Sequence, residues 1–128
     1  MDTDQLAIAL RVSAAGYYPL EAGTELLIGN GTFLDRDDFT TRFVHHGTSE
    51  AIPMAAIDWD AAINALASGG LPCSGGERRI LQLSASLANG TPVSLRDTLT
   101  GLDDHNTARL LTAIRHATGK RPGSNAYR

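Results

Sequence analysis

The chain has 128 residues, which is enough for one hydrophobic core, so we expect a single domain. Hydrophobic residues make up 42% of the sequence and charged residues 20%, a globular composition that excludes disordered, collagen-like and disulfide-stapled classes. The formal net charge is −3, but residues 1–76 hold ten acids and three arginines, whereas residues 77–128 hold eight basic residues and four acids. This asymmetry indicates either attraction between the two parts within the fold, the simpler interpretation, or a basic surface with an anionic partner.

The first residues and the cysteine content bear on location. The stretch "MDTDQLAIALRVSAAG" has no basic flank and only a short apolar run, which is typical of neither a secretory signal nor a membrane span. Cys73 is the single cysteine, so an internal disulfide is excluded and a reducing compartment is indicated. We therefore expect a cytoplasmic protein in which Cys73 is a half-buried structural thiol, although a lone thiol could also be reactive.

Start and stop signals mark three helices in the first part of the chain. Acids at residues 2 and 4 suit the first turn of a helix that stops at Gly16. Pro19 suits the first turn of a second helix, which ends at residues 30–31. A third helix begins at the acids of residues 35–38, places Phe39 and Phe43 on one face, and ends before Gly47. The following stretch, "TSEAIPMAAI", is expected to be irregular.

Four further helices carry clear capping residues. Asp58 caps a helix that stops at residues 68–70, and Ser74 caps the next one. Ser94 caps a short helix closed by Gly101, and the acids at residues 103–104 start a last helix that runs to residue 119. Short links make neighbouring helices pack together. We predict an all-α fold, a compact single-domain bundle of about six to seven short helices over residues 1–119, with a flexible basic tail over residues 120–128.

The stretch "CSGGERRILQLSASLANG" begins with a pattern that fits a capping box. In such a box the Ser74 side chain accepts from the Glu77 amide, and the Glu77 side chain accepts from the Ser74 amide. The same "SGG" and the later "TGLDDHNTARLLTAI" resemble the signature and "GLD" segment of ATP-binding-cassette ATPases, which would imply γ-phosphate binding at a helix start. The chain has no Gly-x-x-x-x-Gly-Lys-Ser/Thr, and Arg96 and Asp97 stand where the magnesium-binding acids belong. We therefore favour the helix cap.

A second resemblance covers residues 78–119, "RRILQLSASLANGTPVSLRDTLTGLDDHNTARLLTAIRHATG". Its order of long helix, turn, short Ser-capped helix, Gly turn and longer helix resembles the DNA-binding module of winged-helix repressors. The resemblance implies that "KRPGSNAYR" is the stub of a wing and that the last helix reads DNA. The residues it assigns to nucleic-acid binding are Asn106, Thr107, Arg109 and Arg115 on that helix, with Lys120 and Arg121 near phosphates. The sequence pI of about 5.7 is unlike that of basic duplex-binding domains.

Other groups of residues could form a metal site, a hydrolase site or a partner-binding site, but each group also has a simpler interpretation. His45 and His46 with nearby aspartates offer metal-ligand types, but adjacent histidines at an expected helix end point apart and suit the helix dipole. His105 or His116 with Ser74 or Cys73 could make a hydrolase, yet no spacing fixes a triad. Aromatic side chains can anchor a protein partner. The candidates for that role are Trp59, Tyr17 and Tyr18, although core packing also accounts for the tryptophan.

These observations favour a binding function over catalysis. The whole chain is similar to small Ala- and Gly-rich actinobacterial-type proteins with an "SGE" or "GGE" helix start and a "GLD" turn, a resemblance that implies a cytosolic accessory protein and no assigned site. We expect a non-enzymatic binding or regulatory module that acts through protein–protein contacts, with no catalytic residues, no cofactor and no metal. The alternatives are a winged-helix-like DNA-binding regulator and, more distantly, a small hydrolase.

Overall fold

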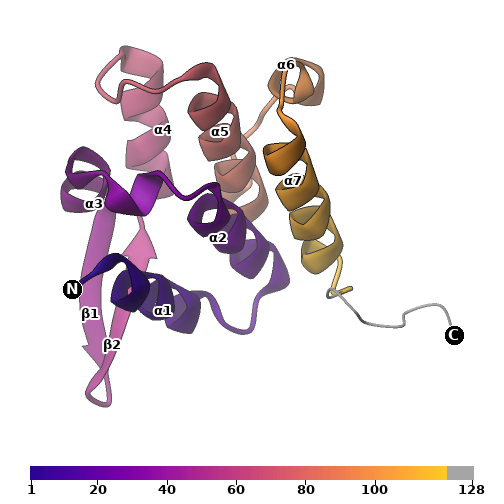
Figure 1. Cartoon of the computed structure of the whole chain (residues 1–128). Helices are drawn as coiled ribbons and strands as arrows, with labels where there is room; N and C mark the ends of the chain where they lie inside the picture. Colours follow the sequence, from indigo (N-terminus) through magenta and orange to yellow (C-terminus); the bar gives the residue numbers. More distant parts are fainter. Residues whose placement is uncertain (121–128) are drawn as a thin grey trace, which may run out of the picture.

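The computed structural model describes residues 1–120, which form seven α-helices, one 3-10 helix and one β-hairpin (Figure 1). The elements in chain order are α1 (Thr3–Ala14), α2 (Tyr18–Asn30), η1 (Phe33–Asp35), α3 (Asp37–Phe43), β1 (Val44–Ser49), β2 (Ile52–Ile57), α4 (Trp59–Ser68), α5 (Gly75–Asn89), α6 (Leu95–Leu99) and α7 (Asp104–Ala117). The expectation of a mostly helical fold with seven helical segments is confirmed. The stricter expectation of an all-α fold is wrong, because the hairpin adds a two-stranded sheet.

Side-chain caps begin the helices where the sequence places them. Asp58 accepts a hydrogen bond from the Ala61 amide at 3.1 Å, and Asp103 accepts one from the Asn106 amide at 2.7 Å. Ser94 accepts from the Asp97 amide at 3.3 Å. Each bond satisfies one amide that the first helical turn leaves without a partner. These three helix starts are confirmed.

The hairpin replaces the end of the expected third helix and the expected irregular segment. The third helix, α3, ends at Phe43, and β1 then pairs antiparallel with β2 from Val44 opposite Ile57 to Ser49 opposite Ile52. The two turn residues, Glu50 and Ala51, have φ values of 50° and 66°, in the left-handed region that a tight two-residue hairpin turn requires. The prediction of a helix that continues until just before Gly47 is therefore wrong, because residues 44–46 belong to β1, and so is the prediction that "TSEAIPMAAI" is irregular.

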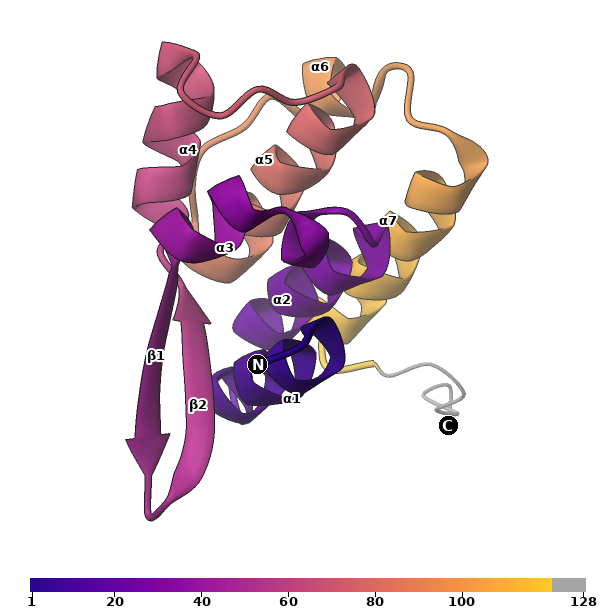
Figure 2. The same ribbon diagram turned by 60° about the vertical axis from the view of Figure 1, so that its left-hand side comes forward.

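Helix α2 lies at the centre of the molecule, with α1 and the hairpin on one side and α5 and α7 on the other (Figures 1 and 2). One buried cluster joins α1, α3, α4 and the hairpin and contains all three phenylalanines and Trp59. A second cluster lies between α2, α5 and α7, and Leu26, Ile80 and Leu110 are among its members. Both α2 and α5 contribute to both clusters, so these two helices couple the two parts of the core. Within residues 1–120 no helix combines the length and the apolarity needed to cross a bilayer.

Candidate functional site

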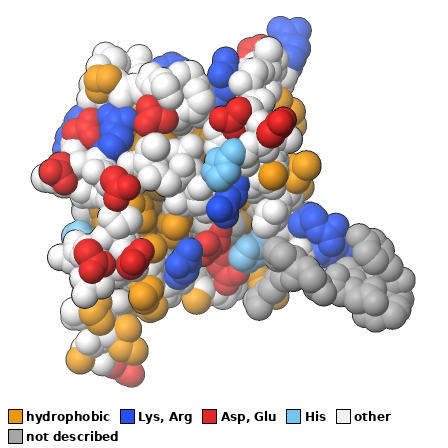
Figure 3. Space-filling model, viewed as in Figure 1, with side chains coloured by type: hydrophobic (Ala, Val, Ile, Leu, Met, Phe, Trp, Pro, Cys, Tyr) orange, Lys and Arg blue, Asp and Glu red, His pale blue; other side chains and the backbone are white. Residues whose placement is uncertain are grey.

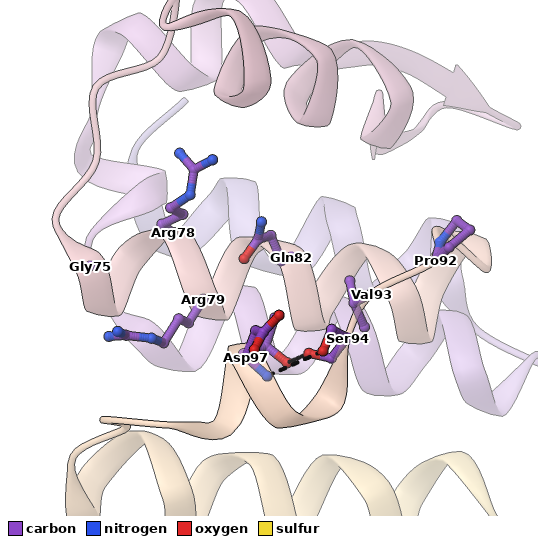
Figure 4. Close-up of a pocket in the computed structure, with 9 residues that line it drawn as sticks. Gly75, Arg78, Arg79, Gln82, Pro92, Val93, Ser94 and Asp97 are labelled. Atoms are coloured by element: carbon purple, nitrogen blue, oxygen red, sulfur yellow. Dashed lines mark hydrogen bonds between the residues drawn. The ribbon is translucent and has the colours of Figure 1, made fainter.

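A groove of about 440 Å³ lies between the first half of α5 and the segment that leads into α6 (Figure 4). We call it the α5–α6 groove. Helix α5 contributes Arg78, Arg79 and Gln82 to its lining, and the opposite wall contributes Val93, Ser94 and Asp97. The groove therefore combines two cations, an amide and a hydroxyl with one carboxylate.

The Arg79 guanidinium packs against the backbone of two glycines, Gly75 and Gly101, which have no side chain in the space that it occupies. A Cβ added at Gly75 would lie 3.2 Å from Arg79 Nη1, and one added at Gly101 would lie 3.4 Å from Arg79 Nη2. Arg79 is half-buried as a result, whereas the neighbouring Arg78 is exposed. Figure 4 shows the two side chains leaving α5 in different directions. Contacts with Gly75 and Gly101 thus restrict the Arg79 side chain, whereas the Arg78 side chain extends into solvent.

Neither arginine of the groove forms an ion pair within residues 1–120. Other arginines do: Arg11 Nε lies 2.6 Å from Glu25 Oε2, and Arg36 Nη2 lies 2.6 Å from Asp38 Oδ2. The carboxylate of the groove, Asp97, lies 3.5 Å from the Nε of its chain neighbour, Arg96. The positive charge of the groove is therefore not neutralised by a close carboxylate contact.

The turn before the groove is a capping box, as the sequence predicts. The Ser74 hydroxyl accepts from the Glu77 amide at 3.2 Å, and the Ser74 amide donates to Glu77 Oε1 at 2.8 Å. This second bond, more than any other contact, lowers the pKa of the Glu77 carboxyl. Both polar groups of Ser74 are thus engaged within the helix start.

Cys73 is half-buried and lies next to a charged network. Arg36 Nη1 lies 3.6 Å from the Cys73 Sγ, while the same guanidinium contacts Asp38. Burial raises the pKa of the Cys73 thiol, an effect that outweighs the opposing contribution of Arg36. The structure therefore places a protonated thiol here at neutral pH, which is not a strong nucleophile.

The structure does not bring the residues of the DNA-binding interpretation onto one face. Asn106 is buried, and its Oδ1 accepts from Asn30 Nδ2 at 3.2 Å, so it joins α7 to α2. Thr107, Arg109, Arg115 and Lys120 are exposed, whereas Arg121 lies outside the described residues. Leu111 lies among the exposed residues of α7 with 59% of its surface accessible.

Helices α5, α6 and α7 follow one another in the chain order that the winged-helix resemblance describes, and the resemblance itself stays a prediction. Helix α7 packs mainly against α2, and α6 packs against α5, so α2 takes the central place. The β-hairpin precedes these helices in the chain and lies across the molecule from α7 (Figure 1). The wing stub and the flexible tail are both predicted over residues 120–128, of which all but Lys120 lie outside the described residues.

The aromatic candidates separate into buried and exposed residues. Trp59 belongs to the core, with 7% of its surface exposed. Tyr17 is 63% exposed at the start of α2. The Tyr18 ring lies 6.2 Å from the ring of His116, so it covers the contact between α2 and α7. Of the three, Tyr17 is the most accessible.

The histidines are placed apart from the expected nucleophiles. His116 Nε2 lies 2.6 Å from Glu21 Oε1, and His105 Nε2 lies 3.4 Å from the Gly29 carbonyl oxygen. In the described part of the chain neither histidine hydrogen-bonds to Ser74 or Cys73.

His45 and His46 lie in β1, not at a helix end, so the helix-dipole explanation for them is wrong. His45 Nε2 lies 3.2 Å from Asp58 Oδ2. No group of three or more ligand side chains suited to a metal ion occurs among residues 1–120.

A second candidate surface is an apolar groove of about 260 Å³ between α1 and the hairpin, which we call the α1–β2 groove. Its lining includes Met1, Ile8 and Val12 from the α1 side and Ile52 and Pro53 from β2. Ile8 is 60% exposed and Ile52 is 52% exposed. Sequence reasoning missed this groove, because its only local signal is the i, i+4 pair Ile8 and Val12.

An acidic pocket adjoins the α1–β2 groove, and Met1 lines both. Asp2, Asp35 and Asp37 contribute its carboxylates. The Thr3 hydroxyl donates to Asp35 Oδ1 at 2.7 Å, which fixes one wall of the pocket against α1. The two surfaces together present aliphatic and anionic groups side by side.

These features define a helical protein with a projecting hairpin, a cationic groove at one end and an apolar groove with an acidic border at the other. Comparison of the chain with protein-family models, with curated proteins and with solved structures gave no match. The function is therefore argued from the surfaces themselves.

Proposed function

We propose that this protein is a non-enzymatic binding module that holds a basic, apolar segment of a partner protein in the α1–β2 groove. The observation that carries the proposal is the exposure of Ile8 and Ile52 on facing sides of one apolar groove. Contiguous exposed aliphatic surface typically marks a docking site, since its burial removes apolar area from water. The groove thus supplies the favourable free energy of association.

The acidic pocket next to the groove sets the expected charge of the partner segment. Its aspartates adjoin the groove at Met1, and residues 1–76 as a whole carry a net negative charge. Figure 3 shows acidic and apolar side chains close together over the start of α1 and the hairpin. Lysine or arginine beside aliphatic residues would complement both surfaces.

Three features of the described residues support binding over hydrolysis. The Ser74 hydroxyl serves the helix cap, burial keeps the Cys73 thiol protonated, and His116 is engaged with Glu21. A nucleophile needs an adjacent base that takes its proton. Within residues 1–120, the side chains that the hydrolase alternative names, Ser74, Cys73, His105 and His116, are not hydrogen-bonded to one another as nucleophile and base.

The test is a selection from a library of random peptides on the immobilised full chain, followed by calorimetric titration of the enriched peptides. We expect enriched peptides to combine Lys or Arg with aliphatic residues. The Ile8→Asp variant should weaken their binding at least about tenfold, because burial of an isoleucine is worth about 1.5–3 kcal/mol.

The matched control is Leu111→Asp, which places the same charge at an equally exposed aliphatic position on α7. This variant should bind the enriched peptides as the wild type does. The proposed site would be refuted if the enriched peptides lacked basic residues, or if Ile8→Asp and Leu111→Asp weakened peptide binding equally. Retention of duplex DNA in place of peptides would favour the nucleic-acid alternative.

A further inference from the structure

The α5–α6 groove holds positive charge that the rest of the described chain leaves unpaired. Arg78 and Arg79 form no ion pair within residues 1–120, although the full sequence contains more acids than basic residues. Arg11 and Arg36 have acidic partners, and Arg42 donates to the Gly70 carbonyl oxygen. Arg78 and Arg79 have neither kind of side-chain contact within residues 1–120, and both line one groove, so the groove offers two cations to an external anion.

The groove also holds the Arg79 guanidinium in position before any ligand binds. The Arg79 guanidinium lies against Gly75 and Gly101, whose lack of side chains leaves the space that it occupies. Less rotamer entropy is lost when an already positioned group binds a ligand. Arg78 is exposed and can rotate to meet the same anion from the other side. Arg79 would serve as the fixed contact and Arg78 as the adjustable one.

The remaining lining determines what kind of anion fits. The Gln82 side chain makes no hydrogen bond within residues 1–120 and can donate to a ligand oxygen. Asp97 on the far wall would repel a second anionic group but would accept a hydrogen bond from a hydroxyl. The groove volume of about 440 Å³ falls in the usual range for small-molecule sites, larger than an inorganic anion needs.

We propose that the α5–α6 groove binds a small phosphate monoester that carries hydroxyl groups. The phosphate lies against Arg78 and Arg79, and the hydroxyl-bearing part reaches toward Asp97. Guanidinium groups donate pairs of hydrogen bonds to phosphate oxygens. The two arginines leave α5 in different directions, so Arg78 has to rotate to share the phosphate that Arg79 holds (Figure 4). Ser74 takes no part, because its hydroxyl and amide are used in the capping box. This site is separate from the α1–β2 groove, so the two proposals stand independently.

The test is a nuclear magnetic resonance titration of the full chain with glycerol 3-phosphate, inorganic phosphate and glycerol. We expect glycerol 3-phosphate to shift the backbone amides of residues 75–82 and 93–98 in a saturable way, inorganic phosphate to bind more weakly, and glycerol to cause no shift. Arg79→Gln should weaken the binding of glycerol 3-phosphate at least about tenfold, because a hydrogen bond to a charged group contributes about 1.5–3 kcal/mol.

The matched control is Arg96→Gln, which removes one positive charge near the groove without removing a lining residue. It should bind glycerol 3-phosphate as the wild type does. If Arg79→Gln fails to fold, which its spectrum reveals, Arg78→Gln supplies the same comparison. Absence of shifts at these amides, equal weakening by the lining and control variants, or binding of duplex DNA without binding of the monoester would overturn the proposal.

Discussion

At the residue scale, Ser74 shows how one side chain fixes the start of α5. Its hydroxyl and amide exchange hydrogen bonds with Glu77, so two groups at the first turn are satisfied together. Ser74→Ala should lower the free energy of unfolding by about 1 kcal/mol, measured by urea denaturation. The control is Ser86→Ala in the same helix, where no cap is removed and stability should change little. An unchanged midpoint in Ser74→Ala would show that the capping bond contributes nothing.

Glu77 makes the same cap sensitive to pH. Its folded-state pKa is lowered, chiefly by the bond from the Ser74 amide, relative to an ordinary value near 4.5. A carboxyl with a depressed folded pKa adds stability that is fully present above the unfolded pKa and is lost as pH falls through the folded pKa. Stability should therefore drop on acidification below about pH 4.5, and Glu77→Gln should reduce that drop. Urea titrations at several pH values measure the slope; an identical slope in Glu77→Gln would contradict this account.

At the element scale, α2 and α5 approach each other at Gly23. A Cβ there would lie 2.5 Å from the Ser84 carbonyl oxygen and 2.6 Å from the Ala88 Cβ, distances that require the backbones to separate. Gly23→Ala should destabilise the protein by about 1–3 kcal/mol despite its better helix propensity.

The control for Gly23→Ala is Gly76→Ala, since a Cβ at Gly76 would make an ordinary 3.8 Å contact with Asn106. The same gain in helix propensity there should leave the protein as stable or more stable. The stabilities of the two variants are compared by thermal unfolding monitored with circular dichroism. Equal effects of the two substitutions would mean that the helices are not closely packed at Gly23.

Helix boundaries could be predicted from the sequence because caps are local. Ser74, Asp58 and Asp103 each bond an amide three residues further on, so a short stretch contains the whole signal. The hairpin has no comparable signal. Its turn is Glu50 and Ala51 instead of the Asn-Gly type, and Pro53 argues against a strand although it is accommodated opposite Thr48.

The candidate surfaces were harder to predict, because each depends on residues far apart in the chain. Ile8 and Ile52 meet only after β2 packs against α1. Arg79 and Asp97 line one groove only because α6 folds back onto α5. The winged-helix resemblance implied that Asn106 reads DNA, but packing of α7 on α2 buries it. Helix periodicity alone does not say which neighbour covers a face.

At the scale of the whole molecule, two contacts connect the acidic and basic parts of the chain. His116 Nε2 lies 2.6 Å from Glu21 Oε1. Arg36 contacts Glu77, which joins a cation of the acidic part to an acid of the basic part and so leaves the excess charge of each part unchanged. Arg78 and Arg79 take no such partner within residues 1–120. Of the two sequence-based interpretations, a basic surface with an anionic partner stays a prediction, and Arg78 and Arg79 of the α5–α6 groove are the residues to which it applies.

The two core clusters share α2 and α5, which predicts that they unfold together. Trp59, the single tryptophan, lies in the larger cluster, whereas Leu110 lies in the cluster between α2, α5 and α7. Leu110→Ala should cost about 2–5 kcal/mol, because it leaves a cavity in a buried site. Tryptophan fluorescence reports the distant cluster and far-ultraviolet circular dichroism reports all helices.

In urea both signals of Leu110→Ala should move to the same lower midpoint, as a two-state transition requires. The reciprocal variant Phe39→Ala, in the larger cluster, should likewise shift both signals together. A fluorescence midpoint that stays at the wild-type value while the circular dichroism midpoint falls would show that α7 detaches alone. Coupling through α2 would then be too weak to make residues 1–120 one cooperative unit, despite the close contact of α2 with α5 at Gly23.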